Sequence, residues 1–253
     1  MDSTIMEVIK HEKRLKALGL ENLSHCDFAH DNRQNLVATN VMREYTDNFK
    51  AMLEDGTGMF IYGNPGAGKT YAAAQIVNEL TDKGYDCMFT SMSNIITELN
   101  TVGIEGKRNL FYQIFSKDLL VLDDLGSEVE TSNSNQIFIQ IVNTCLSKNI
   151  PIIITTPYHD ETLLEGNAKR VMAISRLMRK NISFTMHLPR ERRCRELQQK
   201  QKLEALVKGA ASQTAFTGYG EAETEWHETT VQECLPENIQ QTLPLVETEE
   251  KEE

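Results

Sequence analysis

The feature that most constrains this chain is one segment of the pattern G-x-x-x-x-G-K-[ST], formed by Gly63, Asn64, Pro65, Gly66, Ala67, Gly68, Lys69 and Thr70. Such a segment joins a strand to a helix. The apolar run 59–62 before it predicts a buried strand, and residues 69–83 predict a helix that ends before Gly84. Because both neighbours have the required type, the pattern indicates a phosphate-binding loop rather than a chance glycine-rich turn.

The residue types of this loop suit the binding of ATP together with Mg²⁺. Gly63, Gly66 and Gly68 permit a tight turn whose N–H groups point inward at phosphate oxygens. The N-terminus of the following helix adds partial positive charge. Lys69 is long enough to reach the β- and γ-phosphates, and the Thr70 hydroxyl is a candidate ligand of Mg²⁺.

A second motif combines the apolar run 119–122 with the acidic pair Asp123 and Asp124. The run predicts a strand whose C-terminal end lies at the sheet edge where open α/β folds bind ligands. We expect Asp123 to hold Mg²⁺, directly or through water, and Asp124 to orient the attacking water. Asp124 stands where many such ATPases have a longer Glu. The competing interpretation is a strand end with solvated acids.

Three further segments supply candidates. Thr155 or Thr156, at the end of a predicted strand, could hydrogen-bond the attacking water or simply end the strand with polar groups. Arg170 or Arg176 could stabilise charge on a phosphate held by a neighbouring subunit, or belong to an ordinary basic helix face. Four arginines within residues 190–195 could contact nucleic-acid phosphates or begin a solvated helix.

Strands and helices alternate along the central part of the chain. Strands are predicted at 59–62, 87–90, 119–122, 151–155 and 182–186, and helices at 1–20, 32–53, 69–83, 93–99, 109–116, 135–148 and 161–180. The β-branched residues of 135–148 would also suit a strand. Short connections between alternating elements are typical of a parallel sheet covered on both faces, so the fold class is α/β.

Composition separates the C-terminal part from the rest. Residues 209–253 hold eleven Glu and one Lys, so nearly all of the net charge of −11 belongs to this tail, which we expect to be disordered. A near-neutral remainder does not argue against nucleic acid. The five cysteines are scattered and no long apolar run occurs, which favours a cytoplasmic protein with reduced thiols, no membrane span and no secretory signal.

Taken together, four strings resemble the DnaC/DnaI-type loaders of the replicative helicase: GNPGAGKT, LLVLDDLGSE, PIIITT and RVMAISRL. The lead-in KALGLENLSHCDFAHDNRQNLVATNVMREYTDNF is also similar, so the resemblance covers about residues 14–195. Those loaders are AAA+ ATPases, and the transposon helper ATPase IstB is their close relative. The resemblance therefore implies a P-loop AAA+ parallel five-stranded sheet flanked by helices, with little or no helical lid.

The resemblance also implies roles for individual residues. Lys69 and Thr70 match the nucleotide site, Asp123 and Asp124 the acidic pair, and Thr156 lies at or beside the first sensor. The segment with Arg170 and Arg176 matches the finger and second sensor, and either arginine could be the finger. The sensor position often holds Asn in the family, whereas here Pro157 follows Thr156.

The expected organisation has four parts: a helical lead-in (1–50), the AAA+ core (51–195), a basic helical extension (196–208) and the acidic tail (209–253). Expected partners are a replicative ring helicase, single-stranded DNA and, when ATP is bound, further copies of the chain. Only about a dozen residues precede the stretch that resembles the loaders, so the first helix or the tail would have to grip a helicase, unless the partner differs.

The sequence is compatible with several functions. A helicase-loader-like ATPase comes first, an IstB-type transposition helper second, and a nucleotide-binding adaptor with little turnover third. A metabolic kinase is weaker, because nothing after the loop resembles a small-substrate pocket. Residues 240–245, QQTLPL, loosely resemble the glutamine-led motifs that dock on sliding clamps, although such short patterns often arise by chance.

Overall fold

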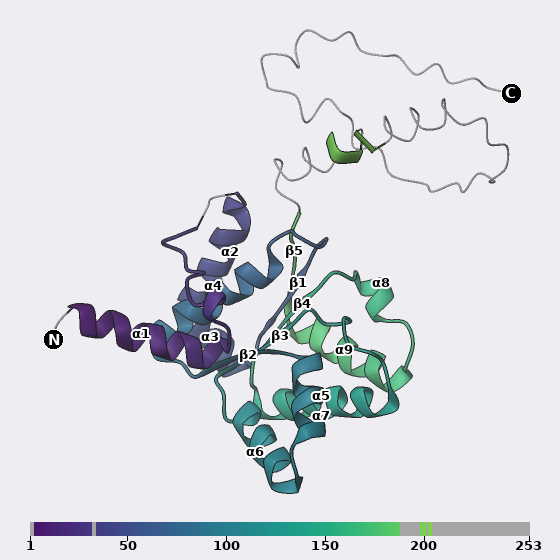
Figure 1. Cartoon of the computed structure of the whole chain (residues 1–253). Coiled ribbons are helices and arrows are strands. Elements are labelled where there is room, and N and C mark those ends of the chain that lie inside the picture. Colours follow the sequence, from purple (N-terminus) through teal and green to yellow (C-terminus); the bar gives the residue numbers. More distant parts are fainter. Residues whose placement is uncertain (1–2, 32–33, 188–197, 201, 204–253) are drawn as a thin grey trace, which may run out of the picture. The chain divides into compact units, whose positions relative to one another are not determined.

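The computed structural model describes residues 3–31, 34–187, 198–200 and 202–203. Residues 3–187 belong to one compact unit built on a five-stranded parallel sheet, in the order β2-β3-β4-β1-β5 (Figure 1). The strands are β1 (Met59–Tyr62), β2 (Cys87–Ser91), β3 (Leu119–Asp123), β4 (Ile152–Thr156) and β5 (Ile182–Thr185). This arrangement confirms the predicted parallel sheet.

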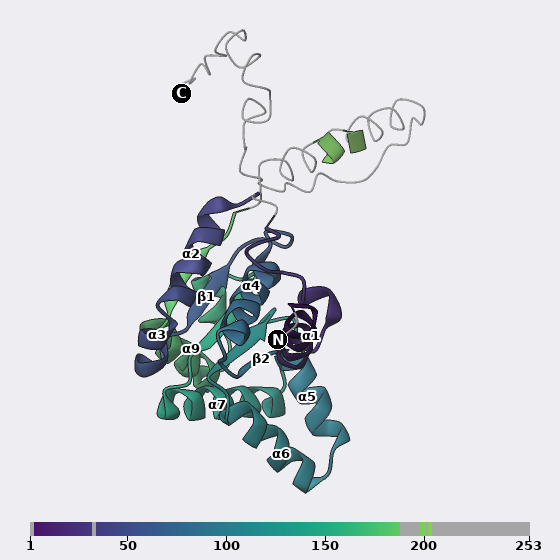
Figure 2. The same ribbon diagram turned by 90° about the vertical axis from the view of Figure 1, so that its left-hand side faces the viewer.

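The helices of the described chain cover both faces of the sheet. They are α1 (Ser3–Leu18), the 3-10 turn η1 (Glu21–Leu23), α2 (Leu36–Asp47), α3 (Phe49–Asp55), α4 (Lys69–Asp82), α5 (Met92–Thr101), α6 (Ile104–Phe115), α7 (Ser132–Lys148), α8 (Asp160–Leu163) and α9 (Ala168–Lys180). The core on one face joins the sheet to α1, α2 and α4, and the core on the other joins it to α5, α6, α7 and α9 (Figure 2).

The central strands are buried on both faces, which explains their continuous apolar sequence. In β3, Leu119 to Leu122 are fully buried, and β4 is buried along its whole length. A strand in a parallel sheet that lies between two helical layers has no solvent-facing side, so it shows no alternation of polar and apolar residues.

Two predicted helices are interrupted in the structure. The stretch predicted as one helix over 32–53 divides at Asn48, which ends α2 and whose side-chain amide donates to the carbonyl of Glu44. The stretch predicted over 161–180 divides into α8 and α9. Gly166 lies between them with a φ of 88°, and the side chain of Asn167 caps α9 by accepting from Lys169 and Arg170 N–H groups.

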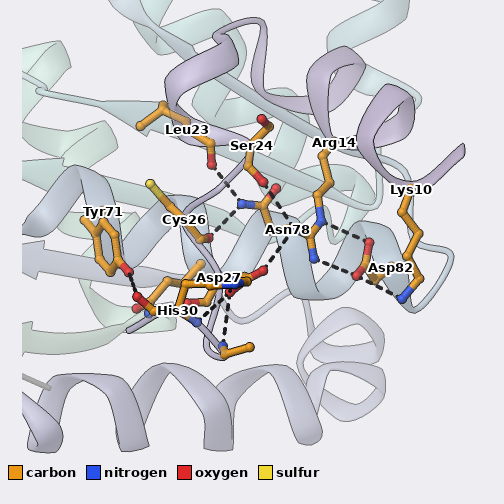
Figure 3. A network of polar contacts seen from close by, with 12 residues as sticks. Lys10, Arg14, Leu23, Ser24, Cys26, Asp27, His30, Tyr71, Asn78 and Asp82 are labelled. Carbon is orange, nitrogen blue, oxygen red and sulfur yellow. Dashed lines mark hydrogen bonds and ion pairs between the residues drawn. The ribbon is translucent and has the colours of Figure 1, made fainter. Parts of the chain in front are cut away.

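The segment before α2 is held against α4 by side chains of α4 and α1 (Figure 3). Asn78 is fully buried, and its side chain donates to the carbonyls of Leu23 (2.9 Å) and Cys26 (2.7 Å). Arg14 of α1 forms ion pairs with Asp27 (3.2 Å) and with Asp82 of α4 (2.8 Å). The segment between α1 and α2 therefore packs on α4, the helix that follows the predicted phosphate-binding loop.

Helix α1 contributes to the apolar core between the sheet, α2 and α4 only through its C-terminal half. Leu18 is buried, whereas the apolar residues Ile5, Val8 and Ile9 are exposed. The helix predicted over 1–20 therefore forms, but no described residue covers the apolar side chains of its first turns.

The cysteines within the described residues are Cys26, Cys87 and Cys145, and all three are buried free thiols. Burial raises the pKa of Cys87 and of Cys145 to about 12, so these thiols stay protonated at neutral pH. No helix within residues 3–31, 34–187, 198–200 and 202–203 is long and apolar enough to span a bilayer.

Several predictions lie outside the described residues. These are the arginines of 190–195, the disordered state of the acidic tail 209–253, the motif at 240–245 and the question of a helical lid after β5. Of the predicted basic extension 196–208, residues 198–200 and 202–203 are described and are helical.

Candidate functional site

The predicted phosphate-binding loop joins β1 to α4 at the carboxyl edge of the sheet. Gly63, Gly66 and Gly68 have φ values of 148°, 81° and 95°, which L side chains rarely adopt. A Cβ on Gly63 would lie 2.2 Å from the carbonyl oxygen of Met186, whose N–H donates to the carbonyl of Tyr62 (2.7 Å). The chain after β5 therefore presses on the loop, and only glycine fits at position 63.

Lys69 is the first residue of α4, and its side chain folds back over the loop. It is 8% exposed, and its ammonium group donates to the carbonyls of Gly63 (2.6 Å) and Asn64 (3.2 Å). Burial lowers the pKa of Lys69, while the nearby carboxylates of Asp124 and Asp123 act in the opposite direction. Phosphate oxygens could replace these two carbonyls as acceptors, and they would keep the amine charged.

Thr70 and Asp123 meet between α4 and the end of β3. The Thr70 hydroxyl lies 3.1 Å from each carboxylate oxygen of Asp123. Burial raises the pKa of Asp123, and hydrogen bonds from Thr155 and Thr70 partly counteract that rise. Residues 53 positions apart are thus brought together by the sheet, as the sequence predicted for a strand end beside the loop.

These groups also fit a magnesium ion by the chemistry of their oxygen atoms. Mg²⁺ prefers hard oxygen ligands, keeps several waters and is commonly held by one or two carboxylates plus substrate phosphates. Thr70 and Asp123 supply adjacent hydroxyl and carboxylate oxygens. Within the described chain no three His, Cys, Asp or Glu side chains gather as ligands, so such an ion would need phosphate and water to complete its shell.

Thr155 connects the two acidic residues. Its hydroxyl donates to a carboxylate oxygen of Asp123 (2.6 Å) and accepts from the backbone N–H of Asp124 (2.8 Å). Asp124 itself is exposed, and its φ of 54° turns the chain sharply after β3. One hydroxyl therefore fixes both the orientation of Asp123 and the start of the turn that carries Asp124.

Thr156 has different contacts, although the sequence left both threonines open for the same role. It is fully buried, donates to the carbonyl of Leu125 (2.9 Å) and accepts from the N–H of Tyr158 (3.2 Å). Successive side chains of a strand point to opposite faces. The structure brings Thr155 to the acidic pair and keeps Thr156 away from it.

The two arginines predicted as finger candidates also differ. Arg176 is exposed on α9 and donates to the side chain of Asn143 on α7 (2.6 Å). Arg170 is 3% exposed and faces the interior of its own chain, where it pairs with Glu128 (2.5 Å). In this conformation Arg170 does not reach outward to a neighbour.

Glu128 is a residue that sequence reasoning missed. It lies between β3 and α7 and is 8% exposed, although Glu is almost never buried unless paired. Its one sequence signal is its position four residues after Asp124, in the string DDLGSE. Nothing in the sequence pairs it with Arg170, which lies 42 positions further along.

Comparisons with known proteins identify a family and relatives for this chain. A family model described as IstB-like ATP binding protein matches residues 9–174. The replicative helicase loader DnaC of Escherichia coli (strain K12) is 30% identical over 139 residues, which are 53% of this chain and 55% of that protein. A putative insertion sequence ATP-binding protein of Sinorhizobium fredii (strain NBRC 101917 / NGR234) is 23% identical over 180 residues, or 70% of this chain and 60% of that protein.

The fold has a counterpart among solved structures. The crystal structure of the DnaC helicase loader matches with a TM-score of 0.55 and 24% identity, over 66% of this chain and 99% of that one. This likeness concerns the fold. The chain spans about half the length of the curated helicase loaders that it matches.

Proposed function

The chain belongs to the family of IstB-like ATP binding proteins, and from that premise we propose that it hydrolyses ATP and acts on single-stranded DNA as a helicase-loader-like protein. The observation that carries the hydrolytic part is the arrangement around Asp123. Thr70 and Thr155 bond its carboxylate, and Thr155 also holds the backbone of Asp124. ATP binding alone would need Asp123, the acid proposed to hold the metal. It would not need Asp124 to be held in place as a second acid.

In this proposal each group of the site has one task. The N–H groups of the loop and the ammonium of Lys69 bind the β- and γ-phosphates of ATP. Thr70 and Asp123 would hold Mg²⁺, which neutralises charge on the phosphates when it is bound. Asp124 orients the attacking water, and Thr155 keeps both acids in place.

The exposed arginine of α9 is the candidate for contact between subunits. Arg176 lies on the surface, and its one described polar partner is the half-buried Asn143. We propose that ATP binding favours packing of copies of this chain, so that Arg176 of one copy approaches the phosphates held by the next. An arginine supplied from outside the site can raise the rate of phosphoryl transfer by about 10³–10⁵.

Helicase loading is proposed from the likeness to DnaC, the most nearly identical of the relatives described above. A transposition helper is the second candidate, because the insertion sequence ATP-binding protein aligns over 70% of the chain against 53% for DnaC. The chemistry at the nucleotide would be the same in both. The partner would be a ring helicase in the first and a transposase in the second.

The test is the rate of ATP hydrolysis without DNA, with single-stranded DNA and with duplex DNA. Slow hydrolysis that rises with single strands supports the loader proposal, and stimulation by duplex alone favours the transposition helper. Lys69→Ala and Asp123→Ala should each remove hydrolysis, which excludes a contaminating ATPase. If the wild-type chain binds ATP but hydrolyses none under any condition, the hydrolytic proposal is wrong and a nucleotide-binding adaptor remains.

A further inference from the structure

We propose that Arg170 and Glu128 form a buried brace that positions Asp124 within the same chain, so that Arg170 is a positioning residue acting in cis. The proposal rests on the proposed hydrolysis for its kinetic consequences, but the brace itself is a property of the fold. It deepens the assignment of the site by adding two residues that touch neither nucleotide nor metal.

Glu128 holds the turn that follows the acidic pair. One of its carboxylate oxygens accepts from the backbone N–H of Gly126 (2.8 Å), two residues after Asp124, and the other receives Arg170 (2.5 Å). The side chain of Glu128 is 2% exposed and that of Arg170 is 4% exposed. A buried carboxylate of this kind is stable as an anion only when it is paired and hydrogen-bonded.

The turn needs such support because its backbone is unusual. Asp124 has a φ of 54°, a conformation that few residues other than glycine adopt, and Gly126 follows it with a φ of 100°, which glycine adopts freely. A Cβ on Gly126 would lie 2.5 Å from the ring of Tyr158, so the turn is also pressed against the chain after β4. Residues in sparsely populated backbone conformations persist only where the surroundings hold them. Thr155 holds the turn at Asp124, and Glu128 holds it at Gly126.

Arg170 is anchored from several sides at once. Besides Glu128, its guanidinium donates to the side chain of Asn135 (3.1 Å), pairs with Glu130 (3.3 Å) and lies 4.8 Å from the ring centre of Phe138. The planar guanidinium is suited to this combination of forked hydrogen bonding and stacking. Moving Arg170 to a neighbouring subunit would leave Glu128 buried without its cation, which is strongly unfavourable.

The brace therefore connects α9 to the acidic pair. Helix α9 carries both Arg170, which points into the chain, and Arg176, which is exposed. A shift of α9 on contact with another subunit would be transmitted through Glu128 to the turn that holds Asp124. In this arrangement Arg176 is the residue of the pair available to a neighbour, and Arg170 sets the geometry at its own site.

Mixing of variants separates a cis role from a trans role. Arg170→Ala keeps an intact loop, and Lys69→Ala keeps an intact Arg170, so a mixture of the two regains hydrolysis if Arg170 serves the neighbouring site. The brace predicts no gain in that mixture, whereas Arg176→Ala mixed with Lys69→Ala regains activity. A gain of hydrolysis in the Arg170→Ala mixture would overturn the proposal.

The kinetic constants give a second measurement. Arg170→Ala and Glu128→Gln should lower kcat by about 10–100-fold, because a small misplacement of a positioned group has effects of that size. The affinity for ATP should stay close to that of the wild type, since neither residue contacts the loop. Arg179→Ala, which removes an exposed arginine from the same helix, is the matched control and should leave both constants unchanged.

Hydrogen exchange at residues 124–128 tests the brace without hydrolysis. The amide of Gly126 should exchange faster in Arg170→Ala and Glu128→Ala than in the wild type, and at the wild-type rate in Arg176→Ala. Arg170→Lys provides a milder change if the alanine variant fails to fold. Unchanged exchange in folded Arg170 and Glu128 variants would overturn the brace, whereas a wild-type chain without hydrolysis but with these exchange differences would overturn only the proposed function.

Discussion

Thr155 and Thr156 are chemically identical neighbours with different contacts. The hydroxyl of Thr155 reaches Asp123 and Asp124, and that of Thr156 reaches Leu125 and Tyr158. The difference follows from the alternation of side chains along β4 together with the strand beside it, since β3 pairs with β4 on this side. A pattern of residue types cannot distinguish the two positions unless the pairing is known.

The first prediction concerns the pH dependence of magnesium-assisted ATP binding. Burial raises the pKa of Asp123, and the hydrogen bond from Thr155 lowers it. Only the ionised carboxylate suits Mg²⁺, so binding should weaken as the pH falls through the pKa of Asp123. Thr155→Val removes the lowering contact, and the loss of binding should therefore begin at a higher pH than in the wild type.

Titration of ATP affinity against pH in the presence of Mg²⁺ measures this effect. Thr155→Ser keeps the hydroxyl and should follow the wild-type curve. Thr156→Val removes a hydroxyl that does not contact Asp123, so the pH at which ATP affinity falls should stay as in the wild type. If ATP affinity falls at the same pH in Thr155→Val and in the wild type, the hydrogen bond from Thr155 does not control the ionisation of Asp123.

At the level of elements, α4 is the helix that joins the site to the rest of the unit. It begins with Lys69 and Thr70. Further along the helix, Asn78 holds the segment before α2, and Asp82 pairs with Arg14 of α1. Its alanine-rich first turns fit tightly against the sheet, with Ala72, Ala73 and Ala74 buried. One helix therefore carries Lys69 and Thr70 at its start and, further along, the contacts that support α1 and the segment before α2, and Figure 3 shows these contacts.

The second prediction tests that support through Asn78. Asn78→Ala should lower the free energy of unfolding by about 2–3 kcal/mol, because the buried carbonyls of Leu23 and Cys26 lose their donor. Urea unfolding measures the change, and proteolysis reports whether the lead-in separates from α4. Asn94→Ala, at an exposed position of α5, is the matched control and should change stability by less than about 0.5 kcal/mol. Equal stability of the two variants would contradict the assigned role of Asn78.

At the scale of the whole unit, the site draws its parts from widely separated segments. Lys69 and Thr70 follow β1, Asp123 ends β3 with Asp124 directly after it, Thr155 is the last residue but one of β4, and Met186 after β5 closes against Gly63. Folding of the sheet and assembly of the site are thus one process. Ligands that bind only the assembled site must stabilise the whole fold.

The third prediction follows from this linkage. ATP with Mg²⁺ at about 100 times its dissociation constant should stabilise the folded chain by about 2.7 kcal/mol. Thermal unfolding with and without nucleotide measures the gain. Lys69→Ala should fold but show little of this gain, since it removes the amine that we propose binds phosphate. A wild-type chain whose unfolding temperature does not respond to ATP would contradict the assignment of the loop as its binding site.

Much of the fold and of the geometry of the candidate site could be predicted from the sequence because the relevant signals are local. Strand, glycine-rich loop and helix follow one another around Gly63 to Thr70, and an apolar run leads directly to Asp123. The interrupted helices were not predicted, since the break at Asn48 depends on a side-chain contact with Glu44 that competes with continuous helix. The uncovered apolar turns of α1 were not predicted either, because periodicity identifies a face but not its partner.

The sequence by itself determined the α/β class, the phosphate-binding loop and the acidic strand end, because each is encoded in residues adjacent along the chain. Only the tertiary structure decided that Thr155 rather than Thr156 serves the acidic pair, and that Arg170 faces Glu128 while Arg176 faces outward. Those choices depend on which strands pair and which helix faces pack. They arise from contacts between residues 31 to 42 positions apart, a range over which local pattern carries no information.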